Sequence, residues 1–511
     1  MLESAHILLR RLDATHTMHE LLAAIDLGSN SFRLQVGKIV NDQIYPRDGL
    51  KEQVQLAAGL DEGKWLDHDA FLRGFQALGR FNERLRGIPR SAVRAVATNT
   101  LRVAKNSAEF IAEAEKVLGI PIEIISGREE ARLIYLGVAH TLPDPMRQQL
   151  VVDIGGGSTE FIIGKSFEPL LLDSKYMGCV SYSLRFFPDG KIDKASLLEA
   201  ELAGRHELQT LSRSYRETGW ELAVGSSGTA KALLEILEQN GWATGAITAD
   251  GLERLRTALL KAGYVSKLKL NGLKADRLPV LLGGFSIMYA VFREFGVERM
   301  QFSEGALRTG VLYDLLGRHH KQDLRDTTVA AFGKHYDVDK EQAEAVSRTA
   351  LHLLEHVNPA TADSEHPDRR FLGWAARLHE IGVTISHASY HKHSAYILEN
   401  ADMPGFSSHD QSRLARIVLG HRGKLARVAD LENNRQDWPL IVCLRLACLL
   451  HRARGVEDTP PAVLEKTNAG FCIRLPAKWL KKRPLTAAAL ENEQRQWLAF
   501  DRGLAVRTTE D

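Results

Sequence analysis

Two segments of this sequence, residues 24–38 and 151–165, carry Asp, Gly and Ser at the same offsets. The first begins Ala-Ile-Asp-Leu-Gly-Ser-Asn-Ser, the second begins Val-Val-Asp-Ile-Gly-Gly-Gly-Ser, and both close with Gly-Lys. Glycines let a backbone approach a ligand closely, and successive N–H groups form a concavity that binds anions. Asp26 and Asp153, each at the end of a strand, can hold a hydrated divalent cation. The repeat therefore predicts two β-hairpins that clamp phosphate groups across a cleft, whereas one copy alone would suit a plain glycine turn equally well.

Residues 124–133 offer a carboxylate for proton transfer. Ser126 and Glu129 have the spacing of a helix-capping pair, and the apolar residues after them indicate the helix that they would cap. Glu130 is not needed for capping and lies in the first helical turn. A carboxylate there could accept a proton from a water molecule that attacks a phosphoryl group. The alternative is an ordinary surface glutamate of a first helical turn.

These side chains need a scaffold, and the segments around them alternate between strand and helix patterns. The expected elements are strands at 92–98 and 121–125 and helices at 107–118 and 194–217. The glycine-rich turns at 224–229 and 303–308 suit anion binding at helix N-termini, and they suit ordinary caps equally well. Together with the repeat, the alternation predicts two duplicated α/β lobes.

Composition limits the class of protein. The chain has 511 residues, of which 44% are hydrophobic and 25% charged, enough for about three or four domains. Residues 1–17 lack the apolar run of a signal peptide, and no stretch approaches about 18 consecutive apolar residues, so we expect no membrane span. Four cysteines without zinc-site spacing indicate buried thiols in a reducing compartment. Because the net charge is only +2, binding of a polyanion would depend on local clusters.

The motifs also resemble those of a known family. Residues 26–32, 125–132 and 153–160 and the pair Gly228-Thr229 resemble motifs of the exopolyphosphatase and guanosine pentaphosphate phosphohydrolase family. They recur in order over almost the whole chain. The resemblance implies an α/β fold of duplicated actin/Hsp70/sugar-kinase-like (ribonuclease H-like) lobes, followed by a helical HD-like C-terminal region.

The resemblance implies roles for individual residues. Glu130 would be the general base that activates water, and Asp153 and Glu160 would organise Mg²⁺ and the terminal phosphate. The residues expected to bind phosphate are Asn30, Ser31, Arg102, Gly155, Gly156, Gly157, Ser158, Gly228 and Thr229. Further implications are Mg²⁺ as cofactor, K⁺ as activator and a homodimer. Relatives often carry a basic residue where this chain has Gln53 or Gln55.

From about residue 316 the pattern changes to successive helices. The pair His379-Glu380 resembles the His-Asp pair that binds metal in HD phosphohydrolases, and Cys448 falls about where a later Asp is expected. We therefore predict a degenerate metal site without a second activity. The predicted domains are 1–20 (N-terminal extension), 21–142 (first lobe), 143–315 (second lobe), 316–450 (HD-like helical domain) and 451–511 (small C-terminal domain).

Basic side chains near helix ends of the C-terminal half offer a path for a polyanion. They are His391, Lys392, His393, His421, Arg422 and Lys424. A phosphate polymer needs spaced cations, and several contacts along its length slow its release between cleavages. The alternative is that these groups lie on solvated helix faces.

The favoured interpretation is an exopolyphosphatase that releases terminal orthophosphate processively from long-chain inorganic polyphosphate. Residues 391–396 (His-Lys-His-Ser-Ala-Tyr) look more like the exopolyphosphatase branch of the family. The nearest alternative is a guanosine pentaphosphate (pppGpp) 5′-phosphohydrolase, and more remote ones are a sugar or acetate kinase and a non-catalytic polyphosphate or alarmone sensor. We expect a bacterial, cytoplasmic protein that binds no nucleic acid, with peripheral association with the membrane left open.

Overall fold

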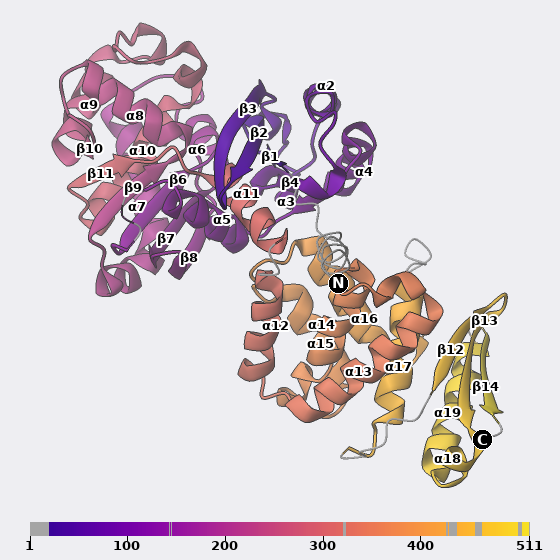
Figure 1. The fold of residues 1–511 in the computed structure, drawn as a ribbon. Helices are drawn as coiled ribbons and strands as arrows, with labels where there is room; N and C mark the ends of the chain where they lie inside the picture. Colours follow the sequence, from indigo (N-terminus) through magenta and orange to yellow (C-terminus); the bar gives the residue numbers. More distant parts are fainter. Residues whose placement is uncertain are drawn as a thin grey trace, which may run out of the picture. The chain divides into compact units, whose positions relative to one another are not determined.

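The computed structural model describes residues 20–142, 144, 146–319, 323–425, 428, 437–454, 462–498 and 503–509. The chain divides into two compact units between Asp323 and Leu324. The first unit contains two α/β lobes, and the second contains a helical bundle and a small sheet (Figure 1). The predicted N-terminal extension, residues 1–20, lies outside the described residues except for Glu20.

The first lobe is built on a five-stranded sheet in the order β3-β2-β1-β4-β5. Its strands are β1 (Leu21–Leu27), β2 (Ser31–Val40), β3 (Gln43–Gln53), β4 (Val93–Ala97) and β5 (Ile122–Ile124). Strands β1, β2 and β3 pair antiparallel, whereas β1, β4 and β5 pair parallel. The central β1 is apolar on both faces, because both faces of this sheet are covered. This strand order is that of a ribonuclease H-like lobe.

Helices α2 (His68–Arg84) and α4 (Ser107–Leu118) pack on one face of this sheet, and the short α3 (Asn99–Val103) follows β4. Asp67 caps α2 by accepting a hydrogen bond from the Ala70 backbone N–H (2.6 Å). Gly119 ends α4 in the left-handed conformation, with φ of 78°. The other face of the sheet is left for the helices that connect the two lobes.

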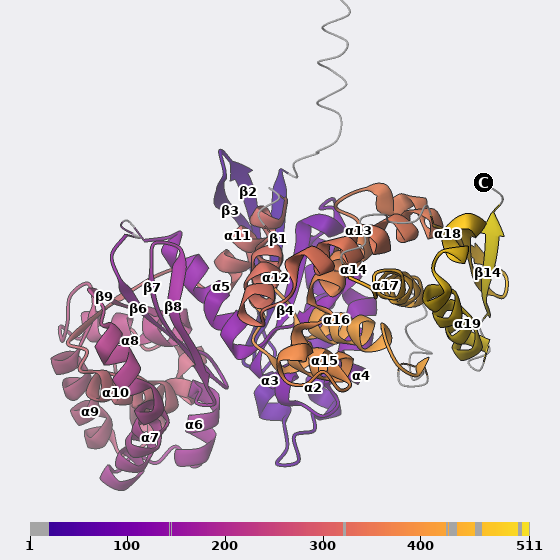
Figure 2. The same ribbon diagram turned by 90° about the horizontal axis from the view of Figure 1, so that it is seen from below.

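The second lobe repeats this arrangement. Its sheet has the order β10-β11-β9-β6-β7-β8, so β8-β7-β6-β9-β11 corresponds to β3-β2-β1-β4-β5. The strands are β6 (Gln149–Ile154), β7 (Thr159–Lys165), β8 (Glu168–Lys175), β9 (Leu222–Ser226), β10 (Ile247–Thr248) and β11 (Arg299–Phe302). The helices are α6 (Cys179–Phe186), α7 (Lys194–Thr218), α8 (Ser227–Gln239), α9 (Ala249–Ala262) and α10 (Leu281–Phe295), drawn in Figure 2. The duplication is confirmed, with β1–β2 and β6–β7 as the matching hairpins.

Two helices connect the lobes: α5 (Gly127–Ala139) runs from β5 to β6, and α11 (Leu307–His319) follows β11 and packs against α5 and β1. Their apolar residues form one core with residues of both sheets, such as Val96 of β4 and Val151 of β6. A Cβ atom on Gly310 would overlap the carbonyl oxygen of Leu133, so α5 and α11 approach as closely as glycine allows. The connecting helices therefore form a tightly packed layer between the two sheets.

One stretch, Ala275–Phe295, is long and apolar enough to cross a membrane by length and composition, with a hydropathy of 1.3 in its most apolar window. It combines a 3₁₀ helix (Ala275–Val280) with α10. In the structure 72% of that window is buried, and α10 packs against α6 and α7 within the second lobe. This is the environment of a core helix.

The second unit is a bundle of helices with a three-stranded sheet. The helices are α12 (Leu324–His335), α13 (Lys340–Val357), α14 (Pro367–Leu378), α15 (Tyr390–Asn400), α16 (Ser408–Gly420), α17 (Trp438–Leu450), α18 (Ala477–Lys481) and α19 (Pro484–Leu498). The strands are β12 (Val463–Thr467), β13 (Gly470–Pro476) and β14 (Gly503–Thr509). Bundle and sheet share one core, in which Trp438 and Trp497 meet with ring centroids 5.6 Å apart. The predicted helical C-terminal region is confirmed, and the division of the chain into five domains stays a prediction.

Candidate active site between the two lobes

A cavity of about 130 Å³, here called the cleft, lies where the β1–β2 and β6–β7 turns meet. The predicted site residues that line it are Asn30, Ser31, Glu130, Asp153, Gly155, Gly156, Ser158, Gly228 and Thr229. Of the residues predicted to bind phosphate or metal, Arg102, Gly157 and Glu160 do not belong to this lining. Arg102 contacts Glu130, and Gly157 lies against Asn99, which lines the cleft. The structure thus brings the predicted residues of the first unit together: most line the cleft, and others lie behind the residues that line it.

The two glycine-rich turns lie in close contact. The Gly155 N–H donates to the Ser158 carbonyl (2.9 Å), which closes the second turn. A Cβ atom on Gly156 would lie 2.9 Å from the Ser29 side chain, and one on Gly157 would lie 2.5 Å from the Asn99 side chain. Side chains are therefore excluded at these positions, and the backbone is left accessible to a small anion.

Buried carboxyl groups gather at this point. Asp26 and Asp153 occupy matching positions near the ends of β1 and β6, and Ser226 donates a hydrogen bond to Asp153. Burial raises the pKa of Asp26 above its ordinary value and raises the pKa of Asp153 to about 6. Burial, and then the charge of Glu130, raise the pKa of Glu160 well above its ordinary value. Carboxylates that are this poorly hydrated are stabilised by a nearby cation.

Mg²⁺ fits this set of oxygen ligands. Within the described part of the chain, no three His, Cys, Asp or Glu side chains gather closely enough to hold a metal ion by themselves. Mg²⁺ is usually held by one or two carboxylates, several waters and the phosphates of a substrate. Asp153, which lines the cleft, and Glu160 behind it would supply protein oxygens, and the substrate would supply the rest.

Glu130 lies in the first turn of α5 and reaches the cleft lining although it is only 7% exposed. Arg102 Nη1 lies 3.3 Å from Glu130 Oε2 and also donates to the Ile125 carbonyl (2.7 Å). Burial raises the pKa of Glu130 to about 7, and the charge of Arg102 limits the rise. A carboxylate with a pKa near neutrality suits the role of general base.

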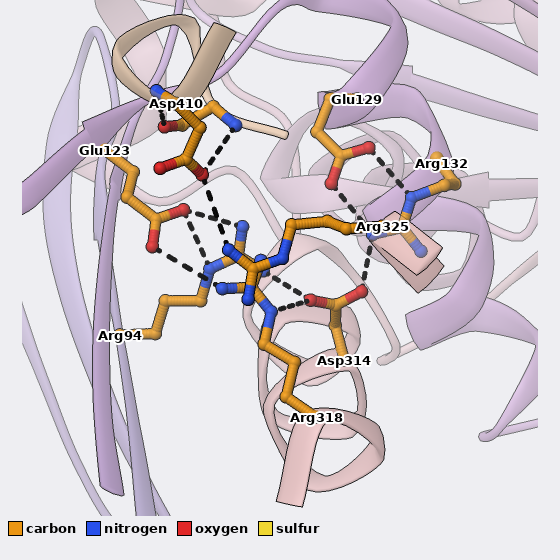
Figure 3. Close-up of polar contacts among 9 residues, drawn as sticks. Arg94, Glu123, Glu129, Arg132, Asp314, Arg318, Arg325 and Asp410 are labelled. Atoms are coloured by element: carbon orange, nitrogen blue, oxygen red, sulfur yellow. Dashed lines mark hydrogen bonds and ion pairs between the residues drawn. The ribbon is translucent and has the colours of Figure 1, made fainter. Parts of the chain in front are cut away.

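The neighbouring Glu129 has a different environment. The Ser126 side chain accepts a hydrogen bond from the Glu129 N–H (3.1 Å), which confirms the predicted N-cap of α5. The Glu129 carboxylate makes a two-point ion pair with Arg132, with both N–O distances 2.8 Å (Figure 3). The two adjacent glutamates therefore differ in role: Glu129 belongs to a buried ion network, and Glu130 faces the cleft.

Two arginines of the cleft lining, Arg33 and Arg277, are absent from the sequence prediction, and a third, Arg308, belongs to the 303–308 turn, for which anion binding was one of two alternatives. Arg33 lies two residues after Ser31 on β2, and strand alternation places both side chains on the same face, a signal that the sequence contained. Arg308 lies 3.7 Å from Asp26. The Arg277 guanidinium lies directly over Gly228, at the N-terminus of α8. A cation at the N-terminus of a helix is unfavourable by itself. An anion bound between the Arg277 guanidinium and the N-terminus of α8 would relieve this repulsion.

The raised pKa of Glu130 predicts the pH dependence of activity. A general base works only as the carboxylate, so kcat/KM should be lost as the pH falls through about 7 and reach its plateau above that value. A bound cation favours the carboxylate, so raising the Mg²⁺ concentration should move the midpoint to lower pH. Initial rates from pH 5 to 9 at two Mg²⁺ concentrations test this. A midpoint near 4.5, the ordinary value for Glu, at both concentrations would contradict it.

The basic residues predicted to guide a polyanion lie in the second unit and differ in exposure. His391 and His421 are buried, and burial holds the pKa of His421 well below its ordinary value. Both side chains are therefore largely withdrawn from solvent, although His421 lines a cavity of about 280 Å³ together with Tyr390 and Arg422. Lys392, Arg422 and Lys424 are exposed, with the Arg422 guanidinium 5.0 Å from the ring centroid of Tyr390, and His393 is half-buried.

The HD-like pair, His379 and Glu380, lies beside His421. His379 Nε2 is 4.0 Å from Glu380 Oε1, and the rings of His379 and His421 are 5.2 Å apart. Arg454 pairs with both carboxylate oxygens of Glu380, at 2.8 and 3.0 Å. The Arg454 guanidinium thus occupies both carboxylate oxygens of Glu380, which a metal ion at this pair would need as ligands.

Two duplicated lobes thus place glycine-rich turns, buried carboxylates and Glu130 around one cleft, an arrangement that suits an enzyme of phosphoryl transfer. Residues 36–319 match the Ppx/GppA phosphatase family, and residues 324–494 match domain III of Ppx/GppA phosphatases. The chain belongs to the Ppx/GppA phosphatase family, as the sequence motifs predicted.

Two relatives match almost the full length of the chain. A guanosine-5′-triphosphate,3′-diphosphate pyrophosphatase of Aeromonas hydrophila is 39% identical over 478 residues, which cover 93% of this chain and 96% of that protein. A protein of the same name from Pseudoalteromonas translucida is 38% identical over 478 residues, with the same coverage of each chain.

Solved structures match a little over half of the chain. A crystal structure of an exopolyphosphatase from Cytophaga hutchinsonii has a TM-score of 0.53 and 26% identity, and the match covers 58% of this chain and 97% of that one. A Ppx/GppA family member from Aquifex aeolicus has a TM-score of 0.50 and 26% identity, covering 58% of this chain and 97% of that one. These matches confirm the predicted actin-like fold and support the coarse activity, a phosphatase.

Proposed function

We propose that this protein hydrolyses guanosine 5′-triphosphate 3′-diphosphate, releasing the terminal 5′-phosphate as orthophosphate. The two relatives that match over nearly the whole chain carry this substrate in their names. Guanosine pentaphosphate therefore replaces inorganic polyphosphate, the substrate favoured from the sequence, as the first candidate. Mg²⁺ as cofactor, K⁺ as activator and a cytoplasmic homodimer are part of the proposal.

The observation that carries the proposal is a second, larger cavity beside the cleft. The cleft, at about 130 Å³, is the smaller of the two and suits a terminal phosphoryl group. A cavity of about 770 Å³, here called the outer hollow, shares Arg33 and Arg308 with the cleft. A phosphate chain that leaves the cleft past these two arginines would continue into the outer hollow.

The outer hollow suits a purine base. His140 and Tyr313, both in its lining, stack with ring centroids 3.5 Å apart and planes 3° apart. Burial lowers the pKa of His140 to about 4, so this ring is neutral at physiological pH. Arg47 and Lys51 line the same cavity and carry positive charge. The Tyr313 ring, one face of which stacks on His140, fits a purine base on its other face, and the cations fit phosphates at two positions. A linear polyphosphate has no use for an aromatic face.

In the proposed reaction Glu130 accepts a proton from water as the water oxygen bonds to the terminal phosphorus. The bond from that phosphorus to the bridging oxygen breaks, so that orthophosphate and guanosine tetraphosphate leave and Glu130 returns its proton to solvent. The guanidinium groups of Arg33, Arg277 and Arg308 stabilise the charge on the phosphoryl oxygens. Mg²⁺, when bound, neutralises further phosphate charge.

Inorganic polyphosphate remains the second candidate, because a solved structure similar to the first unit is an exopolyphosphatase. Both substrates end in the same phosphoryl group, and the cleft accepts either. The exposed Lys392, Arg422 and Lys424 would serve only the polymer.

Steady-state kinetics on guanosine pentaphosphate, long-chain polyphosphate and inorganic tripolyphosphate test the proposal. Guanosine pentaphosphate should have the highest kcat/KM. Replacing Tyr313 by leucine should raise its KM roughly 5- to 150-fold, since stacking of a base is worth about 1–3 kcal/mol, and leave tripolyphosphate hydrolysis unchanged. Tyr264→Leu, a half-exposed tyrosine outside both cavities, is the control. A higher kcat/KM on polyphosphate, with no effect of Tyr313→Leu, would overturn the proposal in favour of the polymer.

A further inference from the structure

A buried network of ion pairs lies behind the cleft, within the first unit (Figure 3). Asp314 is at its centre and accepts from three guanidinium groups: Arg94 Nη1 at 2.8 Å, Arg132 Nη2 at 2.6 Å and Arg318 Nε at 3.1 Å. The side chains of Arg94, Arg132 and Asp314 are each less than a tenth exposed. These three partners hold the pKa of the Asp314 carboxyl well below its ordinary range.

Two further carboxylates belong to the network. Glu129 binds Arg132 at two points, and Glu123 lies 2.8 Å from Arg94 and 3.8 Å from Arg318. Three cations thus face three anions, and every member has at least two partners or a two-point contact. Such balance is what allows charges to stay buried. We call these six residues the Asp314 network.

The network ties four elements together. Arg94 comes from β4 and Glu123 from β5, Glu129 and Arg132 come from α5, and Asp314 and Arg318 come from α11. Because β4 and β5 belong to the sheet of the first lobe, the network fixes both connecting helices to that lobe. The bond from Arg132 to Asp314 is the ion pair that joins α5 directly to α11.

Both connecting helices also carry groups of the cleft. The first turn of α5 supplies Glu130, and the first turn of α11 supplies Leu307 and Arg308. Glu130 stands between Glu129 and Arg132 in the sequence but points to the opposite side of α5, into the cleft. A rotation of α5 about its axis would therefore move Glu130, and the ion pair between Arg132 and Asp314 opposes that rotation.

Apolar packing already restrains this rotation, because Leu133, Ile134 and Val138 of α5 are buried in one core with residues of α11. At the closest approach of the two helices, however, Gly137 and Gly310 have no side chains to interlock. Buried ion pairs contribute little net stability compared with apolar residues of the same volume, but they fix geometry by penalising every arrangement that leaves a charge unpaired. The Asp314 network supplies the directional contacts that the glycines lack.

We propose that Asp314 is a positioning residue for catalysis: through Arg132 it fixes the rotation of α5 so that the Glu130 carboxylate meets the attacking water, while Asp314 itself contacts no substrate. This inference rests on the proposed function in so far as Glu130 is the general base. It predicts that loss of Asp314 lowers the rate of the chemical step more than it weakens substrate binding.

The experiment compares Asp314→Asn with Glu294→Gln in the full-length protein. Glu294 is a matched control, because its side chain is 9% exposed and accepts from Arg205 (3.2 Å) and Arg216 (3.3 Å) on α7, outside the lining of the cleft. Both variants should melt at lower temperature. Only Asp314→Asn should lower kcat, by about 10- to 100-fold with little change in KM, since a misplacement of about 1 Å can cost that much. Asp314→Glu, which keeps the charge, should recover part of the loss.

A double-mutant cycle shows whether Asp314 acts through Glu130. In the Glu130→Gln background, Asp314→Asn should cause no further loss of kcat, because the group that it positions is gone. Equal kcat for Asp314→Asn and Glu294→Gln, or losses that multiply in the double variant, would overturn the inference. The assay uses whichever of guanosine pentaphosphate and polyphosphate the wild-type protein hydrolyses. Failure of the proposed substrate is thereby distinguished from failure of the positioning role.

Discussion

Replacing Glu130 by glutamine should lower kcat for hydrolysis of guanosine pentaphosphate by about 10²–10⁴-fold, the usual contribution of a general base, with little change in KM. Glutamine keeps the size of the side chain and its place in the first turn of α5, but it cannot accept a proton from water. The pairing with Arg102 at 3.3 Å is weakened, which is the main structural cost.

The matched control for Glu130→Gln is Glu109→Gln, an exposed glutamate in the first turn of α4 in the same lobe. It should retain full activity. Phosphate release should be followed together with thermal melting, so that loss of activity is separated from loss of folded protein. A fully active Glu130→Gln protein would show that another group activates the water.

Replacing Asp153 by asparagine should lower activity roughly 10²–10³-fold at limiting Mg²⁺, because removal of a carboxylate near the metal sacrifices several kcal/mol of charge stabilisation. Asp153 is the penultimate residue of the central strand β6, lines the cleft and accepts a hydrogen bond from Ser226. Excess Mg²⁺ should restore part of the rate if the variant mainly weakens metal binding.

Asp173→Asn is the control for Asp153→Asn. Asp173 is a half-buried carboxylate of β8 that accepts a hydrogen bond from the Tyr215 hydroxyl (3.0 Å), outside the cleft lining. Its Mg²⁺ titration should match that of the wild-type protein. The same Mg²⁺ dependence in Asp153→Asn and the wild-type protein would exclude Asp153 from the metal site.

The duplicated hairpins could be predicted from the sequence because their determinants are local. The strands that flank Gly28 and Gly156 are apolar, and each turn must be built from small residues for backbone reasons. The same holds for the N-cap at Ser126, which fixes the start of α5 and thereby the direction of Glu130. Local sequence signals were thus enough to predict the two glycine-rich turns and the position of Glu130.

The ion network and part of the cleft could not be predicted, because their partners are distant in the sequence. Arg132 and Asp314 are 182 residues apart, and Arg94 and Asp314 are 220 residues apart. No periodic pattern marks such pairs, and Arg277 likewise reaches the cleft from the 3₁₀ helix Ala275–Val280, which has no motif of its own. Only the folded chain brings these groups together.

The preferred substrate was the least certain inference from the sequence, for a chemical reason. Polyphosphate and guanosine pentaphosphate end in the same phosphoryl group, so the cleft motifs favour neither. Residues 391–396 favoured polyphosphate, but they lie in the second unit, where His391 is buried. The features that would recognise the base of a nucleotide are the stacked rings of His140, at the end of α5, and Tyr313, in α11. Neither residue belongs to a recognisable motif.

The central claim is that water attacks the terminal 5′-phosphoryl group of guanosine pentaphosphate in the cleft. Hydrolysis in ¹⁸O-labelled water, followed by mass spectrometry of both products, tests it most directly. We predict one ¹⁸O atom in each released orthophosphate and none in the guanosine tetraphosphate, with the reaction lost in Glu130→Gln. Label in the nucleotide product, release of pyrophosphate, or turnover of polyphosphate alone would contradict the claim.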